Sequence, residues 1–251
     1  MDNAQNNSNK YGLIGKNIDY SFSRGYFAEK FQLENLDHTY ENFDLNDISE
    51  FENIFRNNKN IKGLNVTIPY KETVIPYLDK LNKRAKSIGA VNTIKLTKKG
   101  KRIGYNTDYF GFKKSIEPHL TKHHKKALIL GTGGASKAIA YALQKLNIDY
   151  SFVSRTKKEG ITFTYSELTD TIIESHQILI NCTPVGTFPN VNNCPDIPYD
   201  GITNNHILYD LIYNPEKTKF LQLGEVQNAI SINGLKMLEL QAEKAWEIWS
   251  K

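Results

Sequence analysis

The sequence predicts an α/β fold, because short apolar runs typical of strands alternate with segments of helical periodicity along the chain. A glycine-rich turn separates one of these runs from the helical segment that follows it. The chain has 251 residues, of which 39% are hydrophobic and 24% are charged, so either one large domain or two small ones can bury a core. This balance excludes a disordered, collagen-like or coiled-coil protein.

The expected strands are apolar runs bounded by polar or glycine-containing segments. They cover residues 11–14, 64–68, 127–130, 150–153, 178–180, 207–211 and 229–232.

Two amphipathic helices are the clearest helical patterns. In residues 136–146, Ile139 and Leu143 fall on one apolar stripe, as in a helix that covers a sheet. Residues 235–249 carry leucine, alanine and tryptophan at helical spacing, which predicts a helix packed against a partner. Gln241 lies near that stripe, where its amide either bonds to the fold or lines a pocket.

Charge and cysteine content narrow the class of ligand and the compartment. The net charge of +5 suits an anionic small molecule and does not require a nucleic-acid partner. Cys182 and Cys194 lack the spacing of a zinc site or a disulfide framework. We therefore expect no metal, and we expect the protein to be located in a reducing cytoplasm. No apolar stretch is long enough to span a membrane, and the asparagine-rich start lacks a signal-peptide segment and is expected to be frayed.

The glycine-rich turn predicts a dinucleotide site. It consists of Gly131, Thr132, Gly133, Gly134 and Ala135. A strand, then glycines, then a helix is the order of a Rossmann-type fold, in which the backbone approaches a pyrophosphate and the helix amides face its charge. The alternative is a turn that uses glycine only for its positive φ. A domain boundary is expected within residues 105–126, whose basic run at 122–126 we interpret as a solvated linker.

The residues after the second strand of this unit favour NADP over NAD. An NAD site usually carries Asp or Glu at that position. Here Ser154, Arg155 and Thr156 are followed by Lys157 and Lys158. A guanidinium binds a 2′-phosphate through two charge-assisted hydrogen bonds, whereas the alternative is an exposed basic turn.

Several polar residues in the first half are candidates for chemistry. Lys71 stands just after Pro69, which ends the run in which Asn65 and Thr67 share one strand face. A strand end is a usual place for catalysis in α/β proteins, although a lysine there can also be simply solvated. Asp108 could pair with such a lysine or cap the helix that follows it.

Ser21 and Ser23 present two hydroxyls on the same side if their loop is extended. Their alternative role is turn chemistry.

Taken together, the motifs and their order resemble shikimate dehydrogenase, from about Tyr11 to Trp249. The segments are Ile-Gly at 14–15, Ser-Phe-Ser at 21–23, Asn-Val-Thr-Ile-Pro-Tyr-Lys at 65–71, Gly-Ala-Val-Asn-Thr at 89–93, Asn-Thr-Asp at 106–108, the glycine turn, Asn-Cys-Thr-Pro-Val-Gly at 181–186, Asp-Leu-Ile-Tyr-Asn-Pro at 210–215, and Gly-Leu-Lys-Met-Leu-Glu-Leu-Gln-Ala at 234–242.

The resemblance implies reversible reduction of 3-dehydroshikimate to shikimate with NADPH, in the chorismate pathway to aromatic amino acids. It implies a substrate-binding catalytic domain of residues 1–106 and 235–251, completed by the C-terminal helix, and a doubly wound Rossmann-type NADP domain of residues 107–234. Lys71 and Asp108 are expected at the reacting oxygen. The expected substrate contacts are Ser21, Ser23, Thr67, Asn92, Tyr213 and Gln241. The expected cofactor contacts are Gly131, Thr132, Gly133, Gly134, Ala135, Ser154, Arg155, Thr156, Leu211 and Gly234.

Arg24, Tyr26 and Lys236 depart from the family pattern. Glu159 replaces a usual basic residue, so the 2′-phosphate is expected to rest on Arg155 and Thr156, with help from Lys157.

Two rival functions stay open. One is a quinate/shikimate dehydrogenase that uses NAD, and the other is a catalytically silent regulator that binds a dinucleotide or shikimate. A third reading is an α/β scaffold with packing roles alone. The expected partner is a small-molecule substrate, with no nucleic acid or membrane, and the chain is expected to be a monomer or a homodimer.

Overall fold

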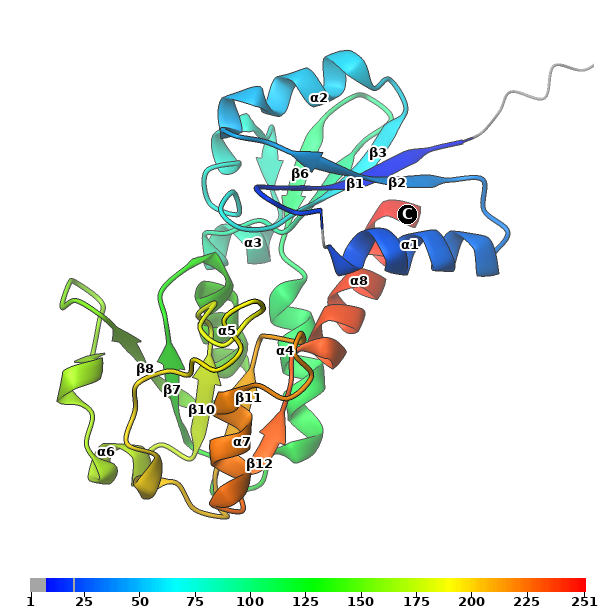
Figure 1. Cartoon of the computed structure of the whole chain (residues 1–251). Helices are drawn as coiled ribbons and strands as arrows, with labels where there is room; N and C mark the ends of the chain where they lie inside the picture. Colours follow the sequence, from blue (N-terminus) through cyan, green and yellow to red (C-terminus); the bar gives the residue numbers. More distant parts are fainter. Residues whose placement is uncertain (1–7, 20) are drawn as a thin grey trace, which may run out of the picture. The chain divides into compact units, whose positions relative to one another are not determined.

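The computed structural model describes residues 8–19 and 21–251 (Figure 1). Most of the tail expected to be frayed, residues 1–7, lies outside the described residues, as does Tyr20. Two compact units make up the fold: unit 1 extends to Thr107 and includes Ala242–Lys251, and unit 2 is Asp108–Gln241. In the described ranges, no helix combines the length and the apolar character needed to cross a membrane.

Unit 1 is built on a mixed sheet with helices on both faces. Its elements are β1 (Lys10–Gly15), α1 (Phe22–Leu33), β2 (Thr39–Asp44), α2 (Phe51–Asn57), β3 (Ile61–Val66), β4 (Lys80–Leu81), α3 (Lys83–Ile88), β5 (Thr93–Leu96) and β6 (Arg102–Tyr105). The strand order is β2-β1-β3-β5-β6-β4. β1 is parallel to β2 and β3, while β5 is antiparallel to β3 and β6.

This topology gives the first sheet one edge where several loops meet. The carboxyl ends of β1, β3 and β6 and the amino end of β5 lie along the same edge, because β5 alone among them runs in the opposite direction. In α/β proteins the carboxyl ends of parallel strands are where ligands usually bind.

Unit 2 is a parallel sheet covered on both faces. Its elements are α4 (Asp108–Ile116), β7 (Lys126–Leu130), α5 (Gly134–Lys145), β8 (Asp149–Ser154), β9 (Phe163–Thr164), α6 (Asp170–Glu174), β10 (Ile178–Asn181), β11 (Ile207–Asp210), α7 (Lys219–Val226), β12 (Ile230–Ile232) and α8 (Leu235–Ser250), the last of which continues into unit 1 after Gln241. The strand order is β12-β11-β10-β7-β8-β9, and every adjacent pair is parallel. The expected α/β class with a doubly wound domain is confirmed.

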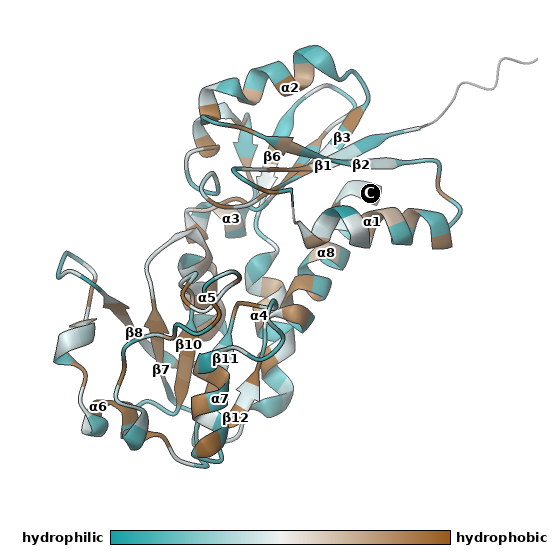
Figure 2. Ribbon diagram, in the orientation of Figure 1, coloured by the Kyte–Doolittle hydropathy of each residue, from teal (hydrophilic) through white to brown (hydrophobic). Residues whose placement is uncertain are grey.

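Consecutive strand residues in unit 2 enter two different apolar cores. Ile129 belongs to the cluster that includes α4 and α5, whereas Leu128 belongs to the cluster that includes α6 and α7. Because side chains alternate across a strand, both faces of a strand must then be apolar. Figure 2 shows β7 and β10 as hydrophobic over most of their lengths, in agreement with the apolar runs at 127–130 and 178–180.

The last helix packs in unit 1 through its C-terminal end. Trp249 is buried, and its indole Nε1 donates to the carbonyl oxygen of Ile94 at 2.9 Å. A Cβ on Gly63 would stand 2.3 Å from the same nitrogen, so only glycine admits the indole at that point of β3. The amphipathic helix expected at residues 235–249 is therefore present, and the apolar partner of its C-terminal end lies in unit 1.

Candidate active site

The expected substrate ligands of unit 1 gather along the sheet edge described above. Ser21 and Ser23 follow β1, Thr67 and Lys71 follow β3, and Asn92 precedes β5. The amide N–H of Thr67 donates to the carbonyl of Ile14 at 2.8 Å, which ties the loop after β3 to the end of β1. Residues far apart in the sequence therefore share one edge of the first sheet.

Lys71 is fixed to this edge through its main chain. Its carbonyl oxygen accepts a hydrogen bond from the N–H of Val91 at 2.7 Å, one residue before Asn92. Lys71 is half-buried and lies five residues after the end of β3. The strand itself ends at Val66, so the expectation that it continues to residue 68 was wrong.

The shorter strand separates the roles of Asn65 and Thr67. Asn65 is buried within β3 and bonded to other side chains, whereas Thr67 is half-buried in the loop beyond the strand. The alternating pattern had indicated that the two polar side chains share one strand face. This prediction was wrong, because Thr67 lies outside the strand.

Asn92 holds the segment that leads to Asp108. Its side-chain Oδ1 accepts from the main-chain N–H of Thr107 at 2.6 Å, and its Nδ2 donates to Thr107 Oγ1 at 2.9 Å. Both Asn92 and Thr107 are almost fully buried, so these bonds are shielded from water. Asp108 follows directly as the first residue of α4 and is itself buried.

The two serines are not equivalent. Ser21 is half-buried at the N-cap position of α1 and makes no capping bond through its side chain. Ser23 is inside the helix and buried, and its side chain interacts with the hydroxyl of Tyr40, whose pKa it lowers. The extended loop considered for this segment is therefore a helix, and residues two apart in a helix do not share a face.

The glycine turn of unit 2 has the geometry of a dinucleotide-binding loop. Gly131 has φ of +103°, and a Cβ there would stand 2.9 Å from the Cγ2 of Thr183. Gly133 is the N-cap of α5, is exposed, and would have open space around an added Cβ. The first turn of α5 carries no side-chain cap and no acidic residue, so its free N–H groups suit a phosphate.

The turn lies at the switch point of the second sheet. β8 pairs with β7 on one side and β10 pairs with β7 on the other, so the loops after β7 and β10 diverge there. Ligands of open α/β sheets bind in the crevice outside the carboxyl ends at such a point.

Beside the turn, a buried polar network fixes the loops after β10 and β11. The side chain of Asn181 donates from Nδ2 to Asp210 Oδ1 at 3.1 Å and accepts from Thr183 Oγ1 at 2.6 Å. Asp210 also accepts from Thr218 Oγ1 at 2.7 Å and from the main-chain N–H of Ile212 at 3.0 Å. The sequence motifs contained Asn181, Thr183, Asp210 and Ile212, but no role had been assigned to them, and Thr218 lay outside the motifs.

Leu211 and Gly234, both expected at the cofactor, touch each other through their main chains. A Cβ on Gly234 would stand 2.1 Å from the carbonyl oxygen of Leu211, so a larger residue would separate the loop after β11 from the loop after β12. Tyr213 is half-buried two residues beyond Leu211. Three of the expected contacts therefore belong to one stretch of the carboxyl edge.

The basic segment after β8 is only partly available to a ligand. Arg155 and Thr156 are exposed, and Ser154 is the half-buried last residue of β8. Lys157 donates from Nζ to the carbonyl of Thr162 at 2.7 Å and pairs with Glu167 at 3.0 Å.

Lys158, in contrast, lies with its Nζ 3.5 Å from the Oγ1 of Thr132 in the glycine turn. Of these two lysines, Lys158 is the one next to the glycine turn, and the role expected for Lys157 fits Lys158 better.

Gln241 is buried near the end of the unit 2 part of α8. Its Nε2 donates to the carbonyl of Leu238 at 2.9 Å. A Cβ on Gly111 would stand 3.2 Å from the Cβ of Gln241 and 2.4 Å from the carbonyl of Met237. Glycine at 111 therefore allows α4 to lie close to α8 where the glutamine begins.

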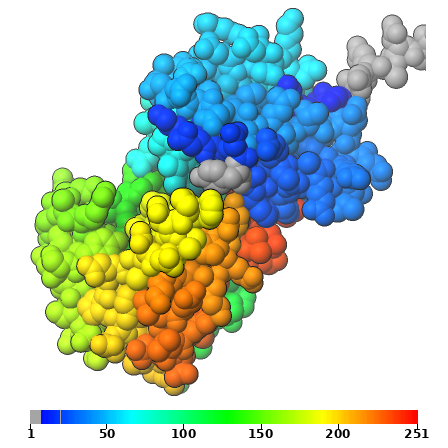
Figure 3. Space-filling view, viewed as in Figure 1, coloured from blue at the N-terminus to red at the C-terminus, as the bar shows by residue number. Residues whose placement is uncertain are grey.

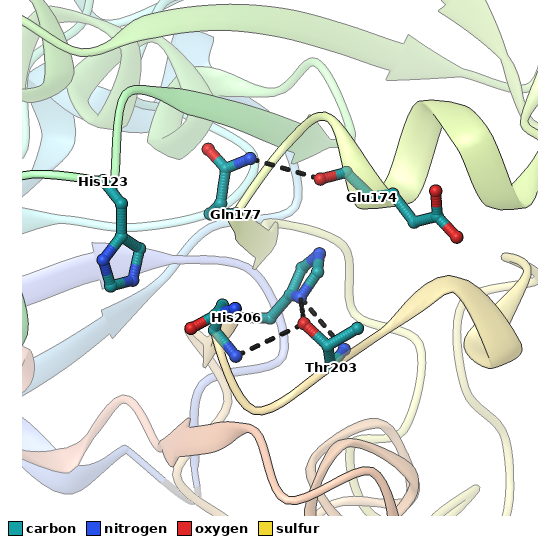
Figure 4. Close-up of a pocket in the computed structure, with 6 residues that line it drawn as sticks. His123, Glu174, Gln177, Thr203 and His206 are labelled. Carbon is teal, nitrogen blue, oxygen red and sulfur yellow. Dashed lines mark hydrogen bonds between the residues drawn. The ribbon is translucent and has the colours of Figure 1, made fainter.

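A surface cavity of about 360 Å³ lies elsewhere, at the amino edge of the second sheet (Figure 4). It is lined by His123, Glu174, Gln177, Thr203, Asn205 and His206, none of which is an expected site residue. His206 is already bonded through Nδ1 to the N–H of Thr203 at 3.0 Å and through Nε2 to Ile173. Residues 8–19 and 21–251 contain no group of three or more His, Cys, Asp or Glu side chains that could hold a metal ion.

Known proteins resemble this chain in sequence over most of its length. A family model described as the shikimate dehydrogenase substrate binding domain matches residues 13–94, the part of unit 1 that contains Ser21, Ser23, Lys71 and Asn92. A curated relative from Methanosphaera stadtmanae named shikimate dehydrogenase (NADP(+)) is 39% identical over 257 residues, covering 95% of this chain and 90% of the relative.

Solved structures extend the similarity over both units. A shikimate dehydrogenase in complex with NADP+ has a TM-score of 0.85 and 34% identity, covering 100% of this chain and 92% of that one. The enzyme from Thermus thermophilus in complex with NADP(H) and shikimate has a TM-score of 0.86 and 26% identity, covering 96% of this chain and 93% of that one.

Proposed function

The chain belongs to the shikimate dehydrogenase family, and we propose that it catalyses the reversible, NADPH-dependent reduction of 3-dehydroshikimate to shikimate. The observation that carries the proposal is the joint placement of Ser23, Lys71 and Asn92 along one sheet edge of unit 1. We assign substrate binding to residues 1–106 with 235–251, and NADP binding to residues 107–234.

The polar edge of unit 1 suits a small ligand rich in hydroxyls and bearing a carboxylate. Hydroxyl and amide side chains can both donate and accept, so they match a ring with several hydroxyls. We assign this role to Ser21, Ser23, Thr67 and Asn92, and extend it to Tyr213 and Gln241 from the family resemblance.

The residues of unit 2 fit NADP. The open approach to Gly133 and the uncapped first turn of α5 suit the pyrophosphate, as does the positive φ of Gly131, which lets the chain turn sharply at the end of β7. Arg155 and Thr156 are exposed after β8, where a 2′-phosphate would lie, and a guanidinium binds that group through two hydrogen bonds. When bound, NADPH supplies the hydride that reduces the ketone.

Lys71 and Asp108 are assigned to the proton side of the reaction. As an ammonium, Lys71 gives a proton to the ketone oxygen while the carbonyl carbon receives the hydride, so one O–H and one C–H bond form as the C=O π bond breaks. In the oxidation direction the neutral lysine accepts the proton from the hydroxyl. The carboxylate of Asp108 is assigned to orient the lysine and to accept a hydrogen bond from the substrate. A positioned acid contributes about 10² to 10⁴ to the rate of such a transfer.

A steady-state assay tests the proposal. Purified protein is mixed with shikimate and NADP+, and the reduced nicotinamide is followed by its absorbance near 340 nm. Turnover that depends on both reactants is expected. Binding of both without any absorbance change would instead support the silent regulator, and absence of nucleotide binding would support a scaffold.

The same assay distinguishes the proposed function from that of a quinate/shikimate dehydrogenase that uses NAD. Shikimate and quinate are each tested with NADP+ and with NAD+, and kcat/KM is compared across the four combinations. The exposed Arg155 after β8, with no acidic residue at the strand end, favours NADP+. A higher kcat/KM with quinate and NAD+ would reverse the assignment.

A further inference from the structure

One buried hydroxyl of unit 1, that of Tyr40, has no role assigned so far. Tyr40 is the one buried side chain of β2, and β2 is an edge strand of the first sheet. Its ring stacks on Phe27 with centroids 4.7 Å apart and planes inclined by 12°, inside an apolar cluster. Burial raises the pKa of Tyr40, so the phenol stays protonated and its hydroxyl needs partners.

Those partners come from two other elements. The hydroxyl donates to Oδ1 of Asn65 in β3 at 2.7 Å, a buried contact. The side chain of Ser23 in α1 also interacts with this hydroxyl and lowers the pKa of Tyr40, against the larger effect of burial. This hydroxyl therefore links α1, the helix that carries an expected substrate ligand, to β3 in the middle of the first sheet.

From Asn65 the network reaches a second expected ligand. Its Nδ2 donates to the main-chain carbonyl of Asn92 at 3.3 Å and to Thr93 Oγ1 at 3.4 Å. The same carbonyl of Asn92 accepts the N–H of Val66 at 2.8 Å. The Asn92 side chain in turn holds Thr107, so a continuous buried chain of polar groups runs from α1 to the residue before Asp108.

We propose that Tyr40 and Asn65 are positioning residues for substrate recognition, acting through Ser23 and Asn92. This inference rests on the proposed function. Tyr40 fixes the side-chain orientation of Ser23, whose hydroxyl would otherwise rotate among three staggered positions. Asn65 fixes the main chain at Asn92. Because neither is assigned to the reacting oxygen, they control affinity for shikimate and leave the chemical step unchanged.

The variant Tyr40→Phe removes the hydroxyl and keeps the ring that stacks on Phe27. The expected result is a KM for shikimate about 3- to 10-fold higher, the range for one lost hydrogen bond, with kcat within about 2-fold and the KM for NADP+ unchanged. If the effect passes through Ser23, Tyr40→Phe adds much less than this factor in a Ser23→Ala background.

A matched control lies in unit 2. The hydroxyl of Tyr209 is buried and shares a 2.6 Å hydrogen bond with Ser115 Oγ, so Tyr209→Phe removes the same kind of Tyr–Ser contact. It is expected to lower the melting temperature while leaving the KM for shikimate unchanged. Should Tyr40→Phe fail to fold, Asn65→Leu breaks the same bond from its other end and takes its place in the comparison.

The outcomes are distinct. Wild-type protein without shikimate turnover overturns the proposed function and this inference with it. Turnover in the wild type together with an unchanged shikimate KM in Tyr40→Phe overturns the inference alone. So does an equal rise in KM in the Tyr209→Phe control, or an undiminished effect of Tyr40→Phe in the Ser23→Ala background, since either result would indicate a general loss of packing.

Discussion

Asp210 carries a buried charge whose removal has a calculable effect. The residue is fully buried at the end of β11, and desolvation raises the pKa of its carboxyl from 3.8 to about 6, against the opposing effect of hydrogen bonds from Thr218, Ile212 and Asn181. A rise of about 2 pKa units corresponds to about 3 kcal/mol of preference for the protonated carboxyl. At neutral pH the ionised carboxylate therefore destabilises the folded protein by that amount.

The substitution Asp210→Asn removes the charge and keeps the shape. Its amide oxygen can accept from Asn181 Nδ2 and the N–H of Ile212, as Oδ1 of the carboxylate does. Its amide nitrogen would face the hydroxyl of Thr218, which can rotate to accept instead of donate.

The sign of the pH dependence follows from the raised pKa. The folded protein holds this proton more tightly than the unfolded chain, so ionisation lowers stability as the pH rises through 3.8, and the loss is complete above about 6. The Asn variant escapes this loss. Relative to the wild type its free energy of unfolding should gain about 1 kcal/mol at pH 4.5 and about 3 kcal/mol at pH 7.5.

Urea unfolding of both proteins at these two pH values measures the effect. Any pH-independent cost of the amide cancels in the comparison, which leaves a growth of about 2 kcal/mol in the relative stability of the variant. A constant difference between the two pH values, or one that shrinks as the pH rises, would refute the assignment of a raised pKa to Asp210.

Three further predictions concern the site. Lys71→Ala should lower kcat by about 10² to 10⁴ with little change in the KM for shikimate, and near-normal turnover would remove the lysine from the mechanism. Gly234→Ala should lower NADP+ affinity by about 10-fold or more, measured by titration, because its Cβ would stand 2.1 Å from the Leu211 carbonyl. Arg155→Ala should reduce the ratio of kcat/KM for NADP+ to that for NAD+ by at least about 10-fold, whereas Lys157→Ala, which breaks the contact with Glu167, should leave the ratio unchanged; equal losses would contradict the division of roles.

Sequence periodicity located the core strands of unit 2 because both of their faces are buried. β7, β10 and β11 are continuous apolar runs, and their bounds match expectation within one residue. β2 was missed because only Tyr40 is buried along it, so it shows no apolar run. β5 and β6 were missed as well, since they are short and carry lysine and arginine.

The site was accessible to the sequence in part. Motifs and their order predicted Lys71, Asn92 and the glycine turn as site residues, since the chemistry of each requires particular residue types. The structure places the first two along one edge of the first sheet and the turn at the carboxyl edge of the second. The interaction of Ser23 with Tyr40 was not accessible, because Tyr40 comes from β2, a different element from the helix that carries Ser23, and nothing in its local sequence marks its hydroxyl. Lys157 was favoured over Lys158 because adjacent lysines look alike until Glu167 is placed beside one of them.

A long loop connects the end of β10 to the short helical turn at Tyr199–Gly201. Part of it, around residues 185–190, lies on the surface of unit 2 and is yellow in Figure 3. Phe188 in this loop is 71% exposed, although its side chain is large and apolar.

A shift of one residue in strand register exchanges the two faces of a strand. When both faces are apolar, as in these parallel strands, the shifted register would still bury apolar side chains on both faces. Asn181 and Asp210 are directly opposed in the pairing of β10 with β11, and their side chains bond at 3.1 Å. A register shift of one residue would place Cys182 or Ile180 opposite Asp210, and the buried carboxylate would lose its hydrogen bond from Asn181. The hydrogen bond between Asn181 and Asp210 thus favours one strand register among several that burial of apolar side chains alone would allow.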